Sequence, residues 1–333
     1  MSLNKRLINT GGALAAGPGF YGMRYTGDGS ATYRNFTGFG FRPDIIWVKG
    51  NGSAMNPAIS TPAGGFAQFV SPYSSNGYVA AASNAYPIDD GITVGGGDGA
   101  NYNQNGTDYD VFAWKAGDSF VTNTNGTITS QVSANVANGI SIVTWSGDAV
   151  NGRTIGHGLS SAPEMIIVKK TSGSSNWIIG GTAVGLSNYL TFQYYSQNIS
   201  SDPTRFQQIT DTTFQVGTNS DINGGASSYI AYCFHSVEGF SQIGQYAATS
   251  SGGTIPTSFA PKFFIGKSTN CSFPFYMKNK YMNNNLYQLT SNGASNTGPG
   301  LNLNADNFYH YLYFSNHLSC GNVFYATFGS DLM

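Results

Sequence analysis

The stretch GFRPDIIWVKG, residues 40–50, returns twice along the chain, as SSAPEMIIVKK (160–170) and as SFAPKFFIGKS (258–268). Each copy places a proline six residues before a lysine and fills the middle with four mostly apolar positions. A run that is apolar on both faces is typical of a central strand covered on each side. The proline suits the start of such a strand, and the closing lysine is expected to keep its charged head in water.

The repeated unit is wider than this strand. Tyr25 aligns with Trp145, and YDVFAW (109–114) aligns with YIAYCF (229–234), both at an offset of 120 residues. A third, shorter copy closes with VFYATF (323–328). Units of this length are tandem domains and not solenoid turns, because each is large enough to bury its own core.

The composition indicates an all-β protein. Only 9% of the residues are charged, whereas 40% are hydrophobic and 44 are glycine. No window shows the apolar periodicity of a capped helix, and short strands separated by Gly- and Asn-rich turns are typical of β-sandwiches. The predicted organisation is an N-terminal arm (1–19), three jelly-roll-like β-sandwich repeats (20–118, 140–239 and 243–333) and a linker hairpin (119–139).

Charge and hydropathy exclude two classes of partner. The net charge is −1 and no basic cluster exceeds Lys169–Lys170, which argues against nucleic acid. No apolar run is long enough to span a membrane. Near the start, Lys5 and Arg6 precede a segment interrupted by residues 9–12, NTGG, so we interpret it as a docking arm and not as a secretion signal. Lys5, Arg6, Leu7 and Ile8 are the candidate anchor.

The three cysteines leave two alternatives open. Cys233 lies in an apolar alternation and is expected to be a buried free thiol. Cys271 and Cys320 either form a bridge or stay free, and free thiols fit a protein completed in a reducing cytoplasm.

Motifs that imitate catalytic or cofactor sites lack their essential parts. ITVGGGDGA (92–100) resembles a nucleotide loop but opens no helix. NYNQNG (101–106) resembles a calcium loop, yet Phe112 stands where a bidentate glutamate is required. His310, His317 and Cys320 lack a fourth zinc ligand. We therefore predict no catalytic residue, cofactor or metal, although paired carboxylates of a glycosidase meet in space and not in sequence.

One stretch, FYHYLYFSNH (308–317), suggests a contact surface. Strand alternation places Tyr309, Tyr311 and Tyr313 on one face. A tyrosine row suits a glycan-stacking surface or a subunit contact. The third interpretation is a strand at a seam between domains.

The motifs together resemble a known repeat. Tyr-x-Gly-Asp-Gly (25–29), Gly-Phe-x-Pro-Asp (40–44) and the closing strand FAWKAG (112–117) are similar to a repeat in virion surface and tail-fibre-type proteins of marine bacteriophages. That repeat has a lectin-like, concanavalin-like sandwich character. The likeness weakens in the third unit, where Gly-Asp-Gly becomes AATSSGG (247–253).

The resemblance implies a non-enzymatic structural protein on the virion surface, assembled in the host cytoplasm. It would be a tail-fibre or receptor-binding component that contacts host glycan or protein. We expect a homo-oligomer, with a trimer favoured, and an arm that docks on other virion proteins. Two alternatives stay open: a head decoration or knob protein of the capsid, and a glycan-degrading tail enzyme.

Overall fold

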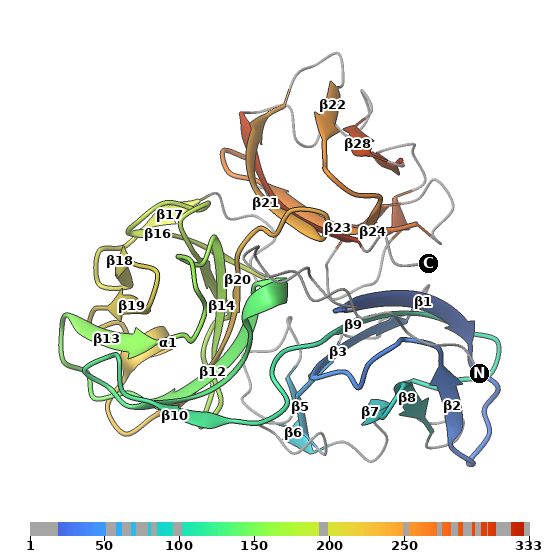
Figure 1. The fold of residues 1–333 in the computed structure, drawn as a ribbon, viewed down its shortest axis with the longest axis horizontal. Helices are drawn as coiled ribbons and strands as arrows, with labels where there is room; N and C mark the ends of the chain where they lie inside the picture. The colour runs from blue at the N-terminus through green and yellow to red at the C-terminus, as the bar shows by residue number, and fades with distance from the viewer. Residues whose placement is uncertain are drawn as a thin grey trace, which may run out of the picture.

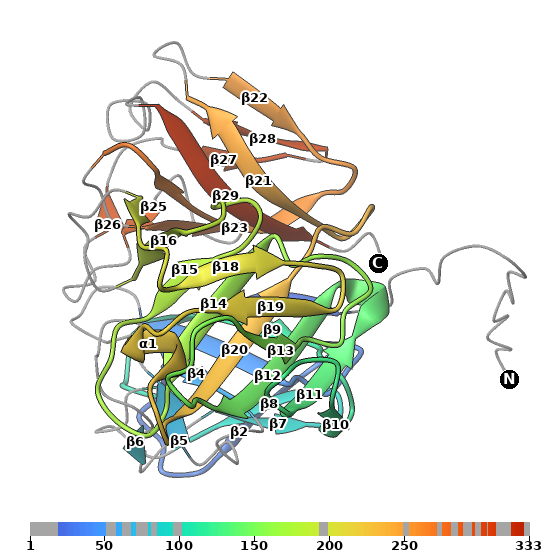
Figure 2. The same ribbon diagram turned by 90° about the vertical axis from the view of Figure 1, so that its left-hand side faces the viewer.

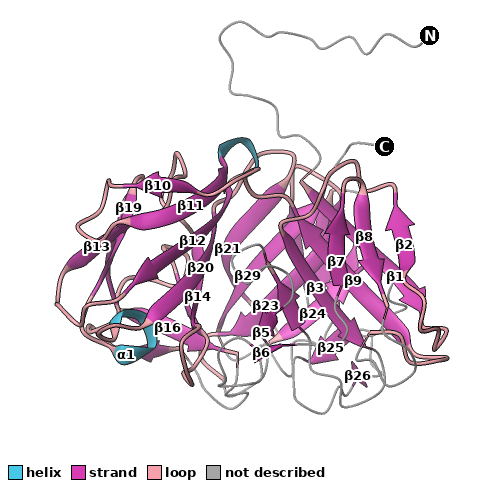
Figure 3. Cartoon of the chain, turned by 90° about the horizontal axis from the view of Figure 1, so that it is seen from below, coloured by secondary structure: helices cyan, strands magenta, loops and turns pink. Residues whose placement is uncertain are grey.

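The computed structural model describes residues 19–329 except 51–57, 62–67, 71–78, 81–84, 96–101, 193–198, 249–252, 272–274, 281–285, 289–294, 297–300, 305 and 311–320. Within these residues every ladder between named strands is antiparallel. The helical segments are a 3-10 turn (Val136–Asn138) and α1 (Ser220–Asn223) (Figure 3). The all-β fold predicted from the sequence is confirmed.

The first pair of sheets belongs to the first repeat. Its large sheet has the strand order β1-β9-β3-β4-β5-β6, and its small sheet has the order β2-β8-β7. The strands are β1 (Phe20–Thr26), β2 (Arg34–Thr37), β3 (Ile45–Gly50), β4 (Ala58–Ser60), β5 (Gln68–Val70), β6 (Val79–Ala80), β7 (Ala85–Ile88), β8 (Gly91–Val94) and β9 (Asp108–Trp114).

The second pair repeats this arrangement and extends it. The large sheet has the order β10-β11-β12-β20-β14-β15-β16-β17, and the small sheet has the order β13-β19-β18. The strands are β10 (Val121–Asn123), β11 (Ser130–Asn135), β12 (Ile140–Ser146), β13 (Arg153–Gly156), β14 (Met165–Lys170), β15 (Ile178–Gly180), β16 (Asn188–Thr191), β17 (Ser200–Ser201), β18 (Phe206–Ile209), β19 (Thr213–Val216) and β20 (Ser228–Phe234).

The third pair has the same two sheets in orders β21-β29-β23-β24-β25-β26 and β22-β28-β27. Its strands are β21 (Ser241–Ala247), β22 (Gly253–Pro256), β23 (Pro261–Ser268), β24 (Tyr276–Asn279), β25 (Leu286–Gln288), β26 (Ser295–Asn296), β27 (Leu301–Leu303), β28 (Asn307–His310) and β29 (Asn322–Gly329). The three pairs surround a common centre (Figure 1), and a view from the side shows the small sheet β13-β19-β18 in front of its large sheet (Figure 2).

The repeated strand lies inside each large sheet and buries both of its faces, as the sequence predicts. In β3, Ile46 and Val48 pack in the core between the two sheets of the first pair. Ile45 and Trp47 point the other way, into a different hydrophobic cluster. In β14 and β23 the side chains alternate between two clusters in the same manner. One face of this strand therefore closes its own sandwich.

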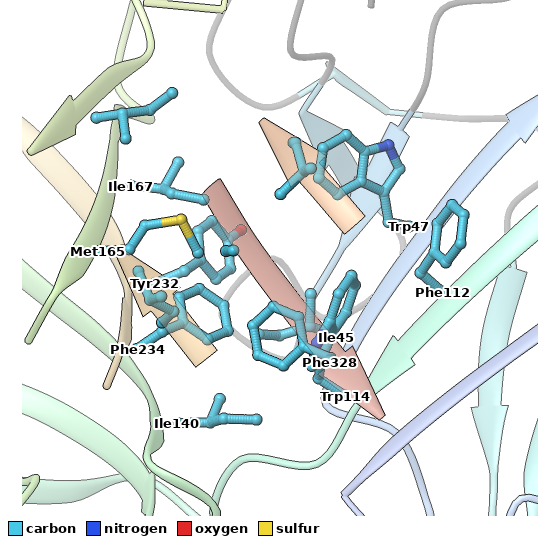
Figure 4. Close-up of a cluster of buried hydrophobic side chains, with 14 of the residues drawn as sticks. Ile45, Trp47, Phe112, Trp114, Ile140, Met165, Ile167, Tyr232, Phe234 and Phe328 are labelled. Carbon is cyan, nitrogen blue, oxygen red and sulfur yellow. The ribbon is translucent and has the colours of Figure 1, made fainter. Parts of the chain in front are cut away.

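The other face packs against the remaining two sheet pairs. Their large sheets meet in one shared core, in which Trp114 of the first pair, Phe234 of the second and Phe328 of the third are all at most 5% exposed (Figure 4). The apolar lining leaves a cavity of about 30 Å³. Burial of this many aromatic and aliphatic side chains makes the shared core the main connection between the repeats.

Polar contacts reinforce the seam at its margin. The buried carboxylate of Asp110 accepts two hydrogen bonds from Arg24, at 3.0 and 2.9 Å. It also accepts one from Asn279 of the third pair, at 2.9 Å. Gln245 of the third pair donates to the Ala183 carbonyl of the second pair at 2.7 Å.

The expectation that the closing lysine keeps its head in water is wrong. Lys49, Lys169 and Lys267 are at most 1% exposed. They lie on the face of the strand that the neighbouring sheet pairs cover. Lys49 Nζ donates to the Gly50 carbonyl at 2.9 Å. Because burial disfavours the charged form, the pKa of each of the three lysines is lowered to about 8.

Residues of the linker hairpin join the second sheet. β10 pairs with β11, and β11 pairs in turn with β12. Ile128, in the connection between β10 and β11, forms a β-bridge with Ile155 of β13. The hairpin therefore closes one side of the second sandwich.

Of the cysteines in the described part of the chain, Cys233 is a buried free thiol and Cys271 is disulfide-bonded. Burial raises the pKa of Cys233 to about 12, because the thiolate has no water around it. The sequence left free and bridged Cys271 as alternatives, and the bridged form is the one present.

Candidate binding surface

The small sheets lie on the outside of the three pairs and present uncharged polar side chains. Apolar residues alternate with polar ones along each strand, and the apolar residues close the sandwich. The cross-strand registers align the polar positions in rows. We call these positions the outer rows: Asn35, Thr93 and Tyr86 in the first pair, Thr154, Gln215 and Gln208 in the second, and Thr254 and Asn302 in the third.

The outer row of the first pair continues into an exposed aromatic residue. Tyr33 is 56% exposed and directly precedes β2. Its ring lies 6.3 Å from that of Tyr86 in an edge-to-face arrangement. A rigid tyrosine pair beside neutral hydrogen-bonding groups is suited to contact with a sugar ring or with a protein surface. Tyr33 could not be identified from the sequence, because an isolated tyrosine in a Gly-rich turn carries no periodic signal.

The predicted tyrosine row is described only at its first member. Tyr309 occupies the middle strand of the small sheet of the third pair, as the backbone partner of Thr254 and Asn302. Tyr311 and Tyr313 lie outside the described residues. Phe308, next to Tyr309, is buried in the core of the third pair.

The candidate anchor residues Lys5, Arg6, Leu7 and Ile8 also lie outside the described part of the chain, which begins at Gly19.

A polar corner fixes the loops at one end of the first two sandwiches. The Asp28 N–H donates to Asn103 Oδ1 at 3.2 Å, and Asn103 Nδ2 donates to Asp28 Oδ1 at 2.9 Å. Arg34 Nε lies 3.3 Å from Asp28 Oδ2. Hydrogen bonds from the Ser30 N–H and from Asn103 lower the pKa of Asp28.

The second sandwich repeats this corner. The Asp148 N–H donates to Asn223 Oδ1 at 3.1 Å, and Arg153 Nε lies 2.5 Å from Asp148 Oδ2. Asn103 and Asn223 are both fully buried. Their side-chain amides are bonded on both sides, so the corner holds two loops together and leaves these amides no hydrogen bonds for a ligand.

The two equivalent corners are a polar feature of the repeats that the motifs described above do not include. Asn103 and Asn223 differ by 120 residues, the same offset as the aligned strands. That offset was a readable signal. The signal is obscured because the asparagine of the first repeat lies in NYNQNG, a stretch that resembles a calcium loop.

Buried groups elsewhere serve the fold. His157 is fully buried, where its Nδ1 accepts from the Leu159 N–H at 3.2 Å and its Nε2 lies 3.1 Å from the Thr210 carbonyl. Burial lowers the pKa of His157 to about 4, so the ring is neutral and donates through Nε2. Among the described residues no three His, Cys, Asp or Glu side chains are grouped as metal ligands. None of the described helices is long and apolar enough to cross a membrane.

Comparison with known proteins places most of the chain in one family. Residues 17–316 match the family described as a domain of unknown function, DUF7483. No curated protein and no solved structure matches the chain.

Proposed function

For this chain, which belongs to the DUF7483 family, we propose a non-enzymatic structural role on the surface of a bacteriophage virion. The chain acts there as a tail-fibre or receptor-binding component that contacts glycan or protein on the host. The phage assignment rests on the resemblance of its repeats to virion surface proteins. The contact role rests on the outer rows.

The outer rows carry the proposal because of their chemistry and their position. The three large sheets bury their inner faces in the shared core. The outer faces of the small sheets are therefore the broad surfaces that a partner can contact. Their rows offer hydroxyl and amide groups without charge, together with Tyr33 and Tyr86 in the first pair. Neutral hydrogen-bonding groups beside aromatic rings match the alternating hydroxyl and C–H surface of a sugar.

The test of the contact role replaces Tyr33 and Tyr86 together with serine. Both side chains lie on the outside of the first pair, so the variant should fold with its thermal midpoint nearly unchanged. We expect its binding to host cells, or to isolated host surface glycan, to fall at least tenfold. Val121→Ser is the matched control, because Val121 is also exposed, at 60%, and lies outside the outer rows. Undiminished binding of the tyrosine variant would remove the outer row of the first pair from the contact surface.

The test of location is immuno-electron microscopy of intact phage particles with antibody against this chain. Label at the tail tip supports a receptor-binding component. Label spread over the head indicates the decoration protein instead, and particles without label would contradict a virion role of either kind.

A further inference from the structure

The hairpin closes one side of the second sandwich, whereas no described residues close the matching side of the first sandwich. β1 is the last strand of its sheet, and no strand of described residues pairs with its outer edge. The equivalent strand in the second pair, β12, is covered by β11 over five residue pairs. Between β1 and β2 lies a groove of about 440 Å³, which we call the β1 groove; it is lined by Tyr21, Met23, Arg24, Asn35, Phe36 and Thr37.

Two equivalent glycines show the difference between the covered second sandwich and the β1 groove, over which no described residue lies. Gly158, with φ of +73°, lies directly beneath β11: a Cβ atom placed on it would meet Val132 at 2.6 Å and Ala134 at 3.3 Å. Gly38 is 120 residues earlier and has a similar left-handed φ of +93°. A Cβ atom on Gly38 would have nothing within 4 Å among the described residues.

The edge of β1 also has the backbone geometry to accept a strand. Lys115 N–H donates to the Gly19 carbonyl and Gly27 N–H donates to the Thr107 carbonyl, which fixes the alternation of the β1–β9 ladder. Phe20 and Gly22 therefore point their N–H and C=O groups away from β9, toward the open edge. An exposed edge of this kind is a template for pairing with another strand.

We propose that the β1 groove is filled by residues 1–18 of a second copy of this chain, which add a strand to β1 as β11 adds one to β12. This inference does not depend on the proposed virion role. The position of the segment supports it: residues 1–18 precede β1 just as the hairpin precedes β12. Eighteen extended residues span up to about 60 Å, which is enough to reach a neighbouring copy.

The side chains of the segment complement the walls of the groove. At the 120-residue offset, Gly12 takes the place of Val132, and it would face Met23, which is larger than the Val143 that faces Val132. Leu14 takes the place of Ala134 and would cover the bare Gly38. The segment thus has a small residue, Gly12, where Met23 fills the groove, and a large residue, Leu14, where Gly38 leaves space.

The backbone at Gly19, directly before β1, favours exchange between copies over folding back on the same chain. The hairpin returns to β12 through the 3-10 turn Val136–Asn138 and Gly139, which has a left-handed φ of +66°. Gly19 occupies the place of Gly139, yet its φ is not left-handed. A Cβ atom on Gly19 would lie 1.6 Å from Asn138 Nδ2 and 3.3 Å from Phe240, so residues of other segments pack closely against the start of β1.

The test uses two full-length variants, Gly12→Cys and Met23→Cys, each with a different affinity tag. Positions 12 and 23 correspond to Val132 and Val143, which lie directly opposite each other as a non-hydrogen-bonded pair of β11 and β12. Cα atoms in such a pair are about 4.5 Å apart, a distance that suits a disulfide. After mild oxidation of the mixed variants, we expect a species of twice the monomer mass that carries both tags. Gly12→Cys mixed with Val150→Cys is the control, since Val150 is exposed on the second sandwich, and should give no such species.

Each other outcome overturns the proposal. Absence of the doubly tagged species in the Met23→Cys mixture would show that the segment does not enter the groove of another copy. A link formed only within single chains of the Gly12→Cys/Met23→Cys double variant would show that the segment folds back on its own sandwich. Deletion of residues 1–17 gives an independent measure: sedimentation should shift to the monomer, and an unchanged oligomer would contradict the exchange.

Discussion

Replacing Phe263 with alanine should weaken the connection between the third and the first sheet pair. Its ring lies 4.5 Å from that of Phe112 and 5.6 Å from that of Trp114, both in the first pair. The lost transfer free energy of a buried phenylalanine is about 1.5–3 kcal/mol. The void left by the ring adjoins the existing cavity, and the three packed sheets cannot move together to fill it. The free-energy cost of this larger cavity adds to the transfer free energy and brings the expected loss of stability to about 4 kcal/mol.

Phe264→Ala is the matched control, one residue along the same strand. Phe264 is equally buried but packs inside the third pair, 5.0 Å from Phe308. Both variants should lose a similar free energy of unfolding in equilibrium denaturation. Only Phe263→Ala should alter native tryptophan fluorescence, because Trp114 borders its ring. A loss below about 1 kcal/mol for Phe263→Ala, with the full loss for Phe264→Ala, would refute a packed core between the pairs.

Three further results are expected from titration and mutation. Asn223→Ala removes the hydrogen-bond partner of the Asp148 N–H and of the Val150 and Gly217 carbonyls, so the free energy of unfolding should fall by about 2–3 kcal/mol in urea denaturation; a loss under about 0.5 kcal/mol would contradict the role of the polar corner in joining the two loops. The pKa of His157 is lowered to about 4 in the folded chain, so as the pH falls this imidazole takes up a proton in the unfolded chain before it does so in the folded one. The free energy of unfolding should therefore fall by about 3 kcal/mol from pH 6.5 to pH 4. His157→Gln should flatten that slope, and an unchanged slope would assign it to other groups. The pKa of Lys169 is lowered to about 8, so stability should rise from pH 8 to pH 10 as the buried amine loses its charge; Lys169→Met should reduce this rise, and an equal rise would count against the burial.

The sequence was sufficient to predict what lies within each repeat. Apolar runs bounded by proline and lysine identified the central strands, because a strand covered on both sides must be apolar at successive positions. Tyr229 and its counterpart Tyr109 marked the closing strand in the same register. These features depend on local alternation and on the 120-residue offset, both of which can be read from one sequence.

What lies between the repeats could not be predicted in the same way. The apolar face of Trp47 indicated that something covers it, but the cover consists of residues far along the chain, such as Phe192 at a ring distance of 6.0 Å. Lys49 was misjudged for the same reason. A lysine at a strand end normally reaches water along its apolar stem, and only the position of the neighbouring sheets shows that here it does not.

The proposed contact surface has the weakest signal in the sequence. The tyrosine alternation at 308–317 pointed to the small sheet of the third pair, where Tyr309 lies in β28. The outer rows of the other two pairs consist of single residues from three strands each. Residues brought together by sheet register and not by spacing along the chain leave no local pattern to read.

Differential scanning calorimetry of the intact chain tests most directly whether the three sheet pairs form one body around a shared core. A shared core predicts a single cooperative transition, in which the calorimetric and van't Hoff enthalpies agree. Three separable transitions, or a calorimetric enthalpy about three times the van't Hoff value, would show that the repeats unfold independently and would contradict the shared core.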